Sequence, residues 1–149
     1  APKWIADLCE KFQGQITSGA NSIAQWAALA AITESHTEVE TMVAAFLQRR
    51  NRMYELFKNE IPELILPKPS GAFYFYPNVS AFLGKQTTSG KLIENTDQLA
   101  DFILEEGLVS VVSGEAFGTH RHIRLSYATS MEQLEKAVSR MKTCLSTLQ

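Results

Sequence analysis

The hydrophobic positions of the chain predict three amphipathic helices. Apolar side chains recur every three or four residues over residues 35–59, 95–107 and 130–145, the spacing of one helix face. Pro62 follows the first stretch and Gly107 closes the second, as expected where helices end. Two of the helices begin at side chains suited to N-capping, Asn95 and Ser130. The first stretch would form a rod of about 35 Å at 1.5 Å per residue, a length that often connects two bodies.

A fourth helix, over residues 23–32, is apolar on nearly every side, because Gln25 is its only polar residue. Either Asn21 or Ser18 can cap its start. A helix that is apolar all round belongs inside a sizeable protein or at an interface. The rest of the chain looks too small to surround it, so we expect the chain to be part of a larger protein.

Shorter apolar and aromatic segments predict strands at 64–66, 72–76, 108–112 and 122–127, joined by loops. The order from residue 64 onward is therefore strand, strand, helix, strand, strand, helix. This order predicts an α+β fold, in which a small, largely antiparallel sheet has its helices packed on one side. The long connecting helix precedes this unit.

Apolar and polar residues alternate within the last predicted strand. Ile123 and Leu125 are predicted to point to one face of the sheet. Arg124 points to the other face, together with His122 and Ser126. A guanidinium in a half-buried strand is costly unless a planar anion meets it, usually a carboxylate or phosphate held by two parallel hydrogen bonds. Taken alone, a strand arginine more often pairs with an internal Asp or Glu than with a ligand.

Composition and charge place the chain among ordinary globular proteins. Its 149 residues are 45% apolar and 20% charged, with a net charge of −2, which argues against disorder. Basic residues are scattered apart from Arg49, Arg50 and Arg52, which fan out over different faces of the long predicted helix. We therefore interpret this triplet as a solvated helix surface and expect no nucleic-acid partner.

Cysteine, histidine and apolar patterns argue against metal, secretory and membrane roles. Cys9 and Cys144 lie near opposite ends of the chain, and the histidines form no HxxxH or CxxC pattern, so no metal site is expected. Two free thiols without a signal peptide fit a cytoplasmic protein. The longest apolar run, which Gln25 interrupts, is too short to span a bilayer, so no membrane partner is expected.

Four segments, in order, carry a resemblance to a known family. They are Gln13–Ser18 with the following Ser22–Gln25, then Pro69–Tyr74, Val111–Gly118 and Ile123–Ala128. In this order and spacing they resemble the C-terminal part of class I pyridoxal-phosphate aminotransferases, and bacterial aspartate aminotransferases most of all. The resemblance runs over essentially the whole chain. Each segment alone is a weak signal, but four collinear segments are a strong one.

The resemblance implies a domain organisation. Members of the family have a large cofactor-binding domain and a smaller domain built from the end of the chain. Residues 1–34 would then be the tail end of the large domain, at the junction. Residues 35–60 would be the long interdomain helix, and residues 61–149 the small C-terminal domain.

The resemblance also implies substrate-binding residues. The family's arginine for the substrate α-carboxylate lies in a strand that reads Arg-Leu-Ser-Tyr/Phe-Ala, which places this role on Arg124 and favours a ligand over an internal ion pair. Arg121 is the competing arginine, but it falls on the opposite face and at the edge of the strand. Phe73, in the Gly-Ala-Phe-Tyr motif, corresponds to an aromatic residue that faces the family's active site. Core packing on a strand is the alternative for Phe73.

Other expectations concern the loops. Thr17 and Ser18 resemble a family segment near the dimer interface and the neighbouring subunit's cofactor phosphate, whereas a helix N-cap is the alternative role for Ser18. Gly71 is expected to take a positive φ in the turn before Phe73. Phe117 is expected to anchor the loop before the arginine strand.

The chemistry that the resemblance implies is incomplete in this chain. The family transfers an amino group from an amino acid to a 2-oxo acid with pyridoxal 5'-phosphate, which a lysine holds as a Schiff base. None of the eight lysines lies in the sequence context of that lysine. We therefore expect a homodimeric aminotransferase as the full-length protein, and no catalytic residue, bound cofactor or activity in this chain alone.

Two alternatives stay open. Another fold-type-I pyridoxal-phosphate enzyme, such as a C–S lyase or a cyclopropane-carboxylate synthase, could share this C-terminal architecture. The other alternative is a free-standing module for carboxylate binding or dimerisation that uses no cofactor. The apolar helix counts against such a module, because a self-sufficient domain would cover that surface.

Overall fold

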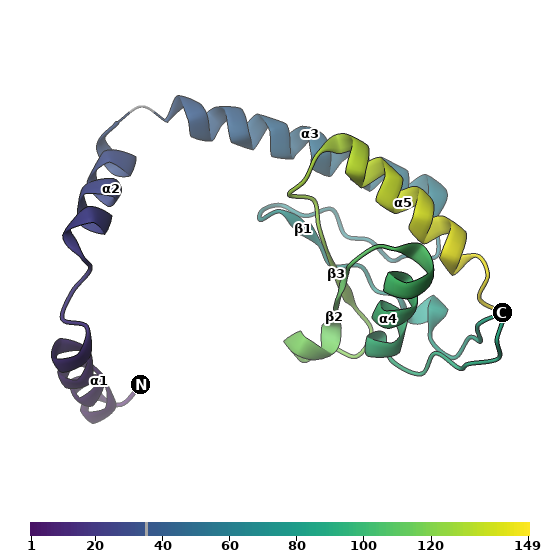
Figure 1. The fold of residues 1–149 in the computed structure, drawn as a ribbon, viewed down its shortest axis with the longest axis horizontal. Coiled ribbons are helices and arrows are strands. Elements are labelled where there is room, and N and C mark those ends of the chain that lie inside the picture. The colour runs from purple at the N-terminus through teal and green to yellow at the C-terminus, as the bar shows by residue number, and fades with distance from the viewer. Residues whose placement is uncertain (35) are drawn as a thin grey trace. The chain divides into compact units, whose positions relative to one another are not determined.

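The computed structural model describes residues 1–34 and 36–149. They divide into two compact units, residues 1–41 and residues 42–149, and each is described by itself. Figure 1 labels the helices and strands of both units, coloured from purple at the N-terminus to yellow at the C-terminus. The predicted start of the long helix at Ser35 lies outside the described residues.

Helix α1 (Lys3–Ile16) is an addition to the elements predicted from the sequence. Trp4, Leu8 and Phe12 recur every four residues along it, and all three side chains are exposed. The chain leaves the helix where Ser18 takes a left-handed backbone conformation, with φ of 57°, and donates its hydroxyl to a carbonyl of the last turn at 3.2 Å. Ser18 therefore closes α1, and the prediction that it could cap the next helix is wrong.

Helix α2 (Ser22–Thr33) confirms the predicted apolar helix. The Asn21 side chain accepts a hydrogen bond from the Ala24 N–H at 2.8 Å, so Asn21 is the N-cap. No residue of α1 or α2 is buried, and Trp26 is 71% exposed. The described residues thus leave the apolar side chains of both helices uncovered.

Helix α3 (Thr37–Glu60) confirms the long predicted helix within the described residues. From Met42 onward the helix belongs to the second unit, where Met53 and Phe57 are buried. Two surface ion pairs join it to helix α5 (Met131–Leu145), Arg52 with Glu135 at 2.7 Å and Lys142 with Glu60. Both pairs are partly exposed, so each contributes little to the stability of the fold.

The sheet of the second unit has three short antiparallel strands in the order β1-β3-β2. These are β1 (Tyr74–Phe75), β2 (Val112–Ser113) and β3 (Ile123–Ser126). The strand that carries Arg124 is therefore the middle one, paired on both sides (Figure 1).

Pro77 interrupts the pairing of β1 with β3. The same register continues past it to an isolated bridge between Asn78 and His122. Pro77 has no N–H to donate, although its carbonyl accepts from the Ile123 N–H at 3.3 Å. The ladder is therefore split, and β1 is shorter than the predicted strand at 72–76.

The predicted strand at 64–66 is wrong apart from one bridge, which joins Ile65 to Asn78. Pro62 and Pro67 flank this segment, and neither can donate a ladder hydrogen bond. Two short 3-10 turns lie in predicted loops, η1 (Ser80–Phe82) and η2 (Gly114–Phe117).

The predicted strand at 108–112 is also largely wrong, because only its last residue enters β2. Leu108 takes a left-handed conformation, with φ of 53°, and its N–H closes the last turn of helix α4 (Thr96–Gly107). Gly107 is the last residue of the helix, as predicted, but the left-handed C-cap is Leu108. The close packing of α4 explains the glycine. A Cβ on Gly107 would lie 2.9 Å from the Cys144 Sγ, so this glycine lets α4 pack closely against α5.

The predicted N-caps of α4 and α5 are confirmed. Asn95 accepts from the Gln98 N–H at 2.9 Å, and Ser130 accepts from the Gln133 N–H at 3.3 Å. The return half of the capping box is shifted by one residue, because the Gln98 side chain accepts from the Glu94 N–H at 2.8 Å.

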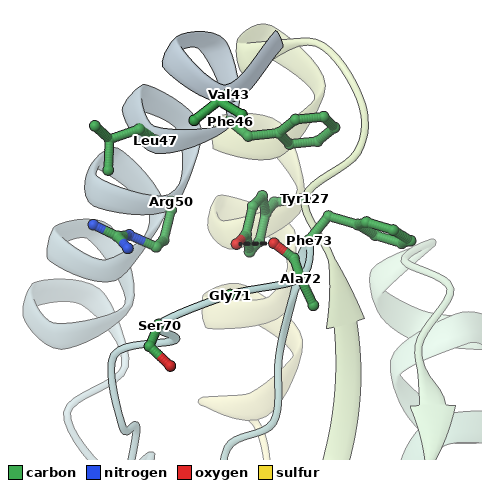
Figure 2. A pocket seen from close by; sticks show the side chains of 9 residues that line it. All are labelled: Val43, Phe46, Leu47, Arg50, Ser70, Gly71, Ala72, Phe73 and Tyr127. Carbon is green, nitrogen blue, oxygen red and sulfur yellow. Dashed lines mark hydrogen bonds between the residues drawn. The ribbon is translucent and has the colours of Figure 1, made fainter. Parts of the chain in front are cut away.

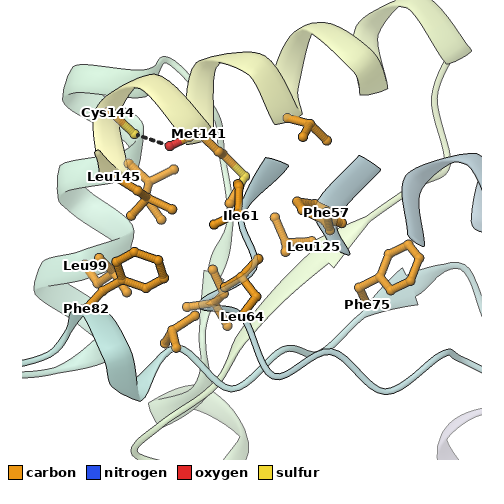
Figure 3. Close-up of a cluster of buried hydrophobic side chains, with 14 of the residues drawn as sticks. Phe57, Ile61, Leu64, Phe75, Phe82, Leu99, Leu125, Met141, Cys144 and Leu145 are labelled. Atoms are coloured by element: carbon orange, nitrogen blue, oxygen red, sulfur yellow. Dashed lines mark hydrogen bonds between the residues drawn. The ribbon is translucent and has the colours of Figure 1, made fainter. Parts of the chain in front are cut away.

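Helices α3, α4 and α5 pack on one face of the sheet and form the core of this unit with it (Figure 3). The rings of Phe57 on α3 and Phe75 on β1 meet edge-on, with their centroids 5.8 Å apart. Other fully buried side chains come from α4, α5 and β3: Leu99, Ile103, Val138, Met141 and Ile123. The predicted α+β fold, a small antiparallel sheet with helices on one side, is confirmed.

Candidate functional site

Arg124 projects from β3 on the face opposite the core. Its neighbours Ile123 and Leu125 are 0% and 7% exposed, whereas Arg124 itself is half-buried. This alternation confirms the facing predicted from the sequence. The register pairs Val112 with Arg124 and Tyr74 with a residue on the same face, so both side chains share the face of the arginine.

Two aromatic rings lie against the Arg124 guanidinium. Its central carbon is 4.7 Å from the ring centroid of Phe117 and 5.7 Å from that of Tyr74, both within the cation–π range of about 6 Å. These two residues are called the flanking rings below. Each is held by a further ring, since Phe117 meets Tyr76 edge-on at 6.1 Å and Tyr74 meets Phe73 edge-on at 6.3 Å.

No carboxylate among the described residues pairs with Arg124. The ion pairs found there join other cations to acids: Lys3–Asp7, Arg52–Glu135, His120–Glu115 and Lys142–Glu60. The contacts of the Arg124 guanidinium within the described chain are those with the flanking rings. The five N–H groups of the guanidinium, which lie in one plane, therefore have no carboxylate acceptor among the described residues. They can donate to a partner outside those residues.

Arg121, the competing arginine, stands in a different setting. It precedes β3, its side chain is exposed, and its backbone carbonyl accepts from the Val79 N–H at 2.8 Å. No ring or carboxylate of the described residues contacts its guanidinium. The two arginines therefore differ in burial and in their aromatic neighbours.

Phe73 lines a cavity of about 310 Å³ and is 52% exposed. Figure 2 shows its ring at one side of this cavity, with Phe46 and Leu47 of α3 above it and Tyr127 beside it. The rings of Phe73 and Phe46 lie 6.3 Å apart. Phe73 is therefore not a core residue. It reaches Arg124 only indirectly, through its contact with Tyr74.

The turn before Phe73 is held from two sides. Arg50 donates to the Pro69 carbonyl at 3.1 Å, and the Tyr127 hydroxyl donates to the Ala72 carbonyl at 2.9 Å (Figure 2). Burial raises the pKa of the Tyr127 hydroxyl, and the charge of Arg50 lowers it in part. The positive φ, 59°, falls on Ala72 and not on Gly71, so that prediction is wrong.

The arginine triplet of α3 does fan out, but it is not simply a solvated surface. Arg49 lies over the Phe46 ring at 5.3 Å, Arg50 is half-buried against the turn described above, and Arg52 pairs with Glu135. Each guanidinium thus has a partner within the same unit.

The loop that carries Phe117 is tight. A Cβ on Gly114 would lie 2.4 Å from the His122 carbonyl, so only glycine fits there. The Thr119 N–H donates to the Gly114 carbonyl at 3.0 Å, and the Thr119 and Tyr76 hydroxyls share a hydrogen bond of 2.5 Å. These contacts anchor the loop. Phe117 itself is 47% exposed and packs against Tyr76 and Arg124, which agrees with the prediction that it anchors the loop.

His122 continues the outer face of the sheet. Its ring stacks on Tyr76 with centroids 5.0 Å apart and planes 11° apart, and its Nδ1 is buried without a hydrogen-bond partner in the described structure. The side chains on this face form one row of successive contacts: Tyr74, Arg124, Phe117, Tyr76 and His122. Phe73, whose ring lies beside Phe46 of α3, meets this row at Tyr74.

Sequence reasoning found Arg124 and Phe73 but missed the flanking rings. Tyr74 has a signal, because two-residue periodicity places it one position from Phe75 and hence on the outer face. Phe117 has none, since its position depends on how the loop at 113–122 folds back onto β3.

The row of side chains around Arg124 contains no lysine. Lysine contacts in the described structure lie elsewhere: Lys3 with Asp7, Lys142 with Glu60, Lys68 over the Tyr54 ring and Lys85 with the Leu148 carbonyl. None joins an amine to Arg124. The described residues also hold no group of three or more side chains placed for a metal ion. No helix among them is both long and apolar enough to cross a membrane.

The site therefore consists of an arginine on the middle strand of an α+β unit, without an acidic partner among the described residues. Comparison with known proteins identifies the family of the chain. The chain belongs to the family described as aminotransferase class I and II, which it matches over residues 1–141. The resemblance drawn from the four sequence segments is thereby confirmed.

Two relatives illustrate the match. The chain is 45% identical over 145 residues to an aspartate aminotransferase of Streptomyces avermitilis, covering 97% of this chain and 35% of that protein. It is 41% identical over 141 residues to a probable aspartate/prephenate aminotransferase of Rhizobium leguminosarum bv. phaseoli, covering 95% and 35%.

A solved structure agrees with these sequences. The crystal structure of the aspartate aminotransferase from Rhizobium meliloti superposes with a TM-score of 0.85 at 34% identity, over 93% of this chain and 34% of that one. The chain therefore spans about a third of the length of the relatives that it matches.

Proposed function

We propose that this chain is the carboxylate-binding part of a pyridoxal-phosphate-dependent aminotransferase, and that Arg124 binds the substrate α-carboxylate. The observation that carries the proposal is the setting of this guanidinium, which is half-buried, flanked by two rings and without an acidic partner among the described residues. Desolvating a charge in this way is costly unless a ligand compensates it. Family membership supports the same role.

The planar fork of Arg124 matches a carboxylate through two parallel hydrogen bonds. Such a two-point grip fixes the direction of the bond from the carboxylate to the α-carbon and so orients the amino group for reaction. The flanking rings lie against the guanidinium and reduce its contact with water, which strengthens its attraction for the anion. Pyridoxal 5'-phosphate, held by residues outside this row, would supply the electron sink for amino transfer.

The proposed substrates are an amino acid of the aspartate type and a 2-oxo acid acceptor. The relatives are named aspartate or aspartate/prephenate aminotransferases, which supports an acidic amino donor. Both substrates carry a carboxylate beside the reacting carbon, so one clamp serves both halves of the reaction. Phe73, at the cavity beside Tyr74, would line the same substrate site.

The proposal extends to the domain organisation. Residues 61–149 would form the small domain, residues 35–60 the interdomain helix, and residues 1–34 the tail end of the large domain. The full-length protein would be a cytoplasmic homodimer. Thr17 and Ser18 would then lie near the neighbouring subunit's cofactor site.

Substituting Arg124→Lys in the full-length protein tests the proposal. Lysine keeps the charge but cannot reproduce the planar two-point grip. Losing one partner of a desolvated charge pair costs about 2–5 kcal/mol, or about 30-fold to several thousand-fold at roughly 1.4 kcal/mol per tenfold. Steady-state kinetics should show this loss of kcat/KM with α-amino acids. An amine without an α-carboxylate should lose far less.

Arg121→Lys is the matched control, because the same substitution three residues earlier changes an exposed arginine without ring neighbours. It should be mild with both substrates. The assignment fails if Arg124→Lys leaves kcat/KM unchanged, or if it harms the amino acid and the carboxylate-free amine equally.

A further inference from the structure

We infer that Phe117 and Tyr74 are positioning residues for Arg124, which hold the plane of its guanidinium so that the N–H edge faces the incoming carboxylate. The inference rests on the proposed function, since it concerns how the same clamp is oriented. The flanking rings would add no hydrogen bond to substrate. They would act by limiting the orientations of the side chain that makes those bonds.

The exposure of the flanking rings is the first support. Phe117 is 47% exposed and Tyr74 is 39% exposed, so neither ring is a core residue. Both nevertheless lie close to one cation, with centroid distances of 4.7 Å and 5.7 Å to the Arg124 guanidinium carbon. The contact with Arg124 is what these partly exposed rings share.

The chemistry of the contact is the second support. A ring attracts a cation to its π face and does not take up the N–H donors that a carboxylate needs. An acidic neighbour in the same place would occupy those donors and compete with the substrate. An arginine side chain carries about 2 kcal/mol of rotamer entropy, so restricting it beforehand lowers the cost of binding.

The packing of the flanking rings against other residues is the third support for the inference. Tyr76 packs edge-on against Phe117, and Phe73 packs edge-on against Tyr74. The loop that carries Phe117 is closed by the contact of Gly114 with the backbone at His122. Each flanking ring is thus packed against a second ring, as a positioning role requires.

The test uses the full-length enzyme with the variants Phe117→Leu and Tyr74→Leu, which remove the rings but keep apolar bulk. Each should raise KM for an α-amino acid by about threefold to thirtyfold, the range expected for a lost cation–π contact. The kcat should change much less, because the carboxylate is held in both the ground state and the transition state. Phe117→Tyr and Tyr74→Phe, which keep the rings, should restore a KM close to that of the parent.

A double-mutant cycle separates positioning from general structural damage. In an Arg124→Gln background no guanidinium remains, so Phe117→Leu should cause no further loss. With a carboxylate-free amine, Phe117→Leu should leave KM unchanged in the parent background. The inference is overturned if Phe117→Leu is as costly in the Arg124→Gln background, or if the ring-retaining Phe117→Tyr is as damaging as Phe117→Leu.

The outcomes also separate the inference from the proposed function. If Arg124→Lys is costly while both leucine variants keep the parent KM, the rings do not position the clamp and the proposed function stands. If Arg124→Lys is itself without effect, the clamp assignment fails and the inference fails with it.

Discussion

At the residue scale, Gly107 and Leu108 divide two tasks that one glycine often performs at the end of a helix. Gly107 provides the close approach of α4 to α5, where a Cβ would meet the Cys144 Sγ at 2.9 Å. Leu108 takes the left-handed conformation, although its side chain is 66% exposed and gains little from burial. A left-handed conformation costs a non-glycine residue about 1–2 kcal/mol.

Leu108→Gly should therefore stabilise the protein by about 0.5–1 kcal/mol, because glycine removes the steric cost while losing more backbone entropy on folding. Gly107→Ala, one residue away, should destabilise it by about 1–3 kcal/mol through overpacking against Cys144. Urea unfolding of the two variants beside the parent chain measures both changes. Equal signs for the two substitutions would contradict this division of roles.

Burial of the Cys144 thiol should lower the folding stability of the chain at alkaline pH. Burial raises the pKa of its thiol above the ordinary value of 9.0, although nearby backbone hydrogen bonds lower it in part. The unfolded thiol loses its proton at a pH where the folded one keeps it, so folding stability should fall as the pH rises past about 9. Thermal unfolding from pH 8 to pH 10 should show a shallower loss in Cys144→Ala. Cys9→Ala, at an exposed site, should keep the parent slope.

Local interactions explain why the roles of some residues could be predicted from the sequence. Asn95 and Ser130 act as N-caps because capping depends on a few neighbouring backbone groups, and Arg124 faces outward because strand alternation is local. The left-handed residues Ala72 and Leu108 could not be predicted, since neither residue type favours that conformation. At Ala72 the carbonyl accepts from the distant Tyr127 hydroxyl, a contact that no local pattern indicates.

At the element scale, helices were more predictable than strands. Helices α4 and α5 follow their apolar periodicity, and α2 follows its nearly unbroken apolar stretch. Each was predictable because a helix satisfies its own hydrogen bonds. The strands depend on partners, so the flanking prolines reduce the segment at 64–66 to one bridge, and Pro77 shortens β1. The order of elements, and hence the fold class, survives these local errors.

The exposed helices α1 and α2 should make the isolated chain self-associate. Their large apolar side chains are exposed within the described structure: Trp4, Phe12, Ile16, Ile23, Trp26 and Ile32. Apolar patches of this kind favour association in water. Sedimentation at several concentrations should show oligomers for residues 1–149 and a smaller species once residues 1–33 are removed. A concentration-independent monomer with a buried Trp26 would count against this prediction.

At the scale of the whole molecule, the residues that bind the substrate carboxylate are expected to be separate from those that bind the cofactor. The row around Arg124 contains no lysine contact, and no lysine of the chain lies in the family's cofactor-binding context. The isolated chain should therefore bind no pyridoxal 5'-phosphate at a specific site and catalyse no transamination. Borohydride reduction with the cofactor, followed by peptide mapping, should yield only sparse surface labelling. A stoichiometric adduct on one lysine would refute the prediction.

The position of Arg124 on the middle strand has a mechanical consequence. β3 is bonded to a neighbour on each side, so the base of this side chain has no free edge about which to bend. An anion bound by the guanidinium is therefore coupled to a strand that is paired on both sides, with the helices packed on the other face of the sheet. A side chain on a loop would lack this support, because displacing the backbone of β3 requires breaking hydrogen bonds to two neighbouring strands.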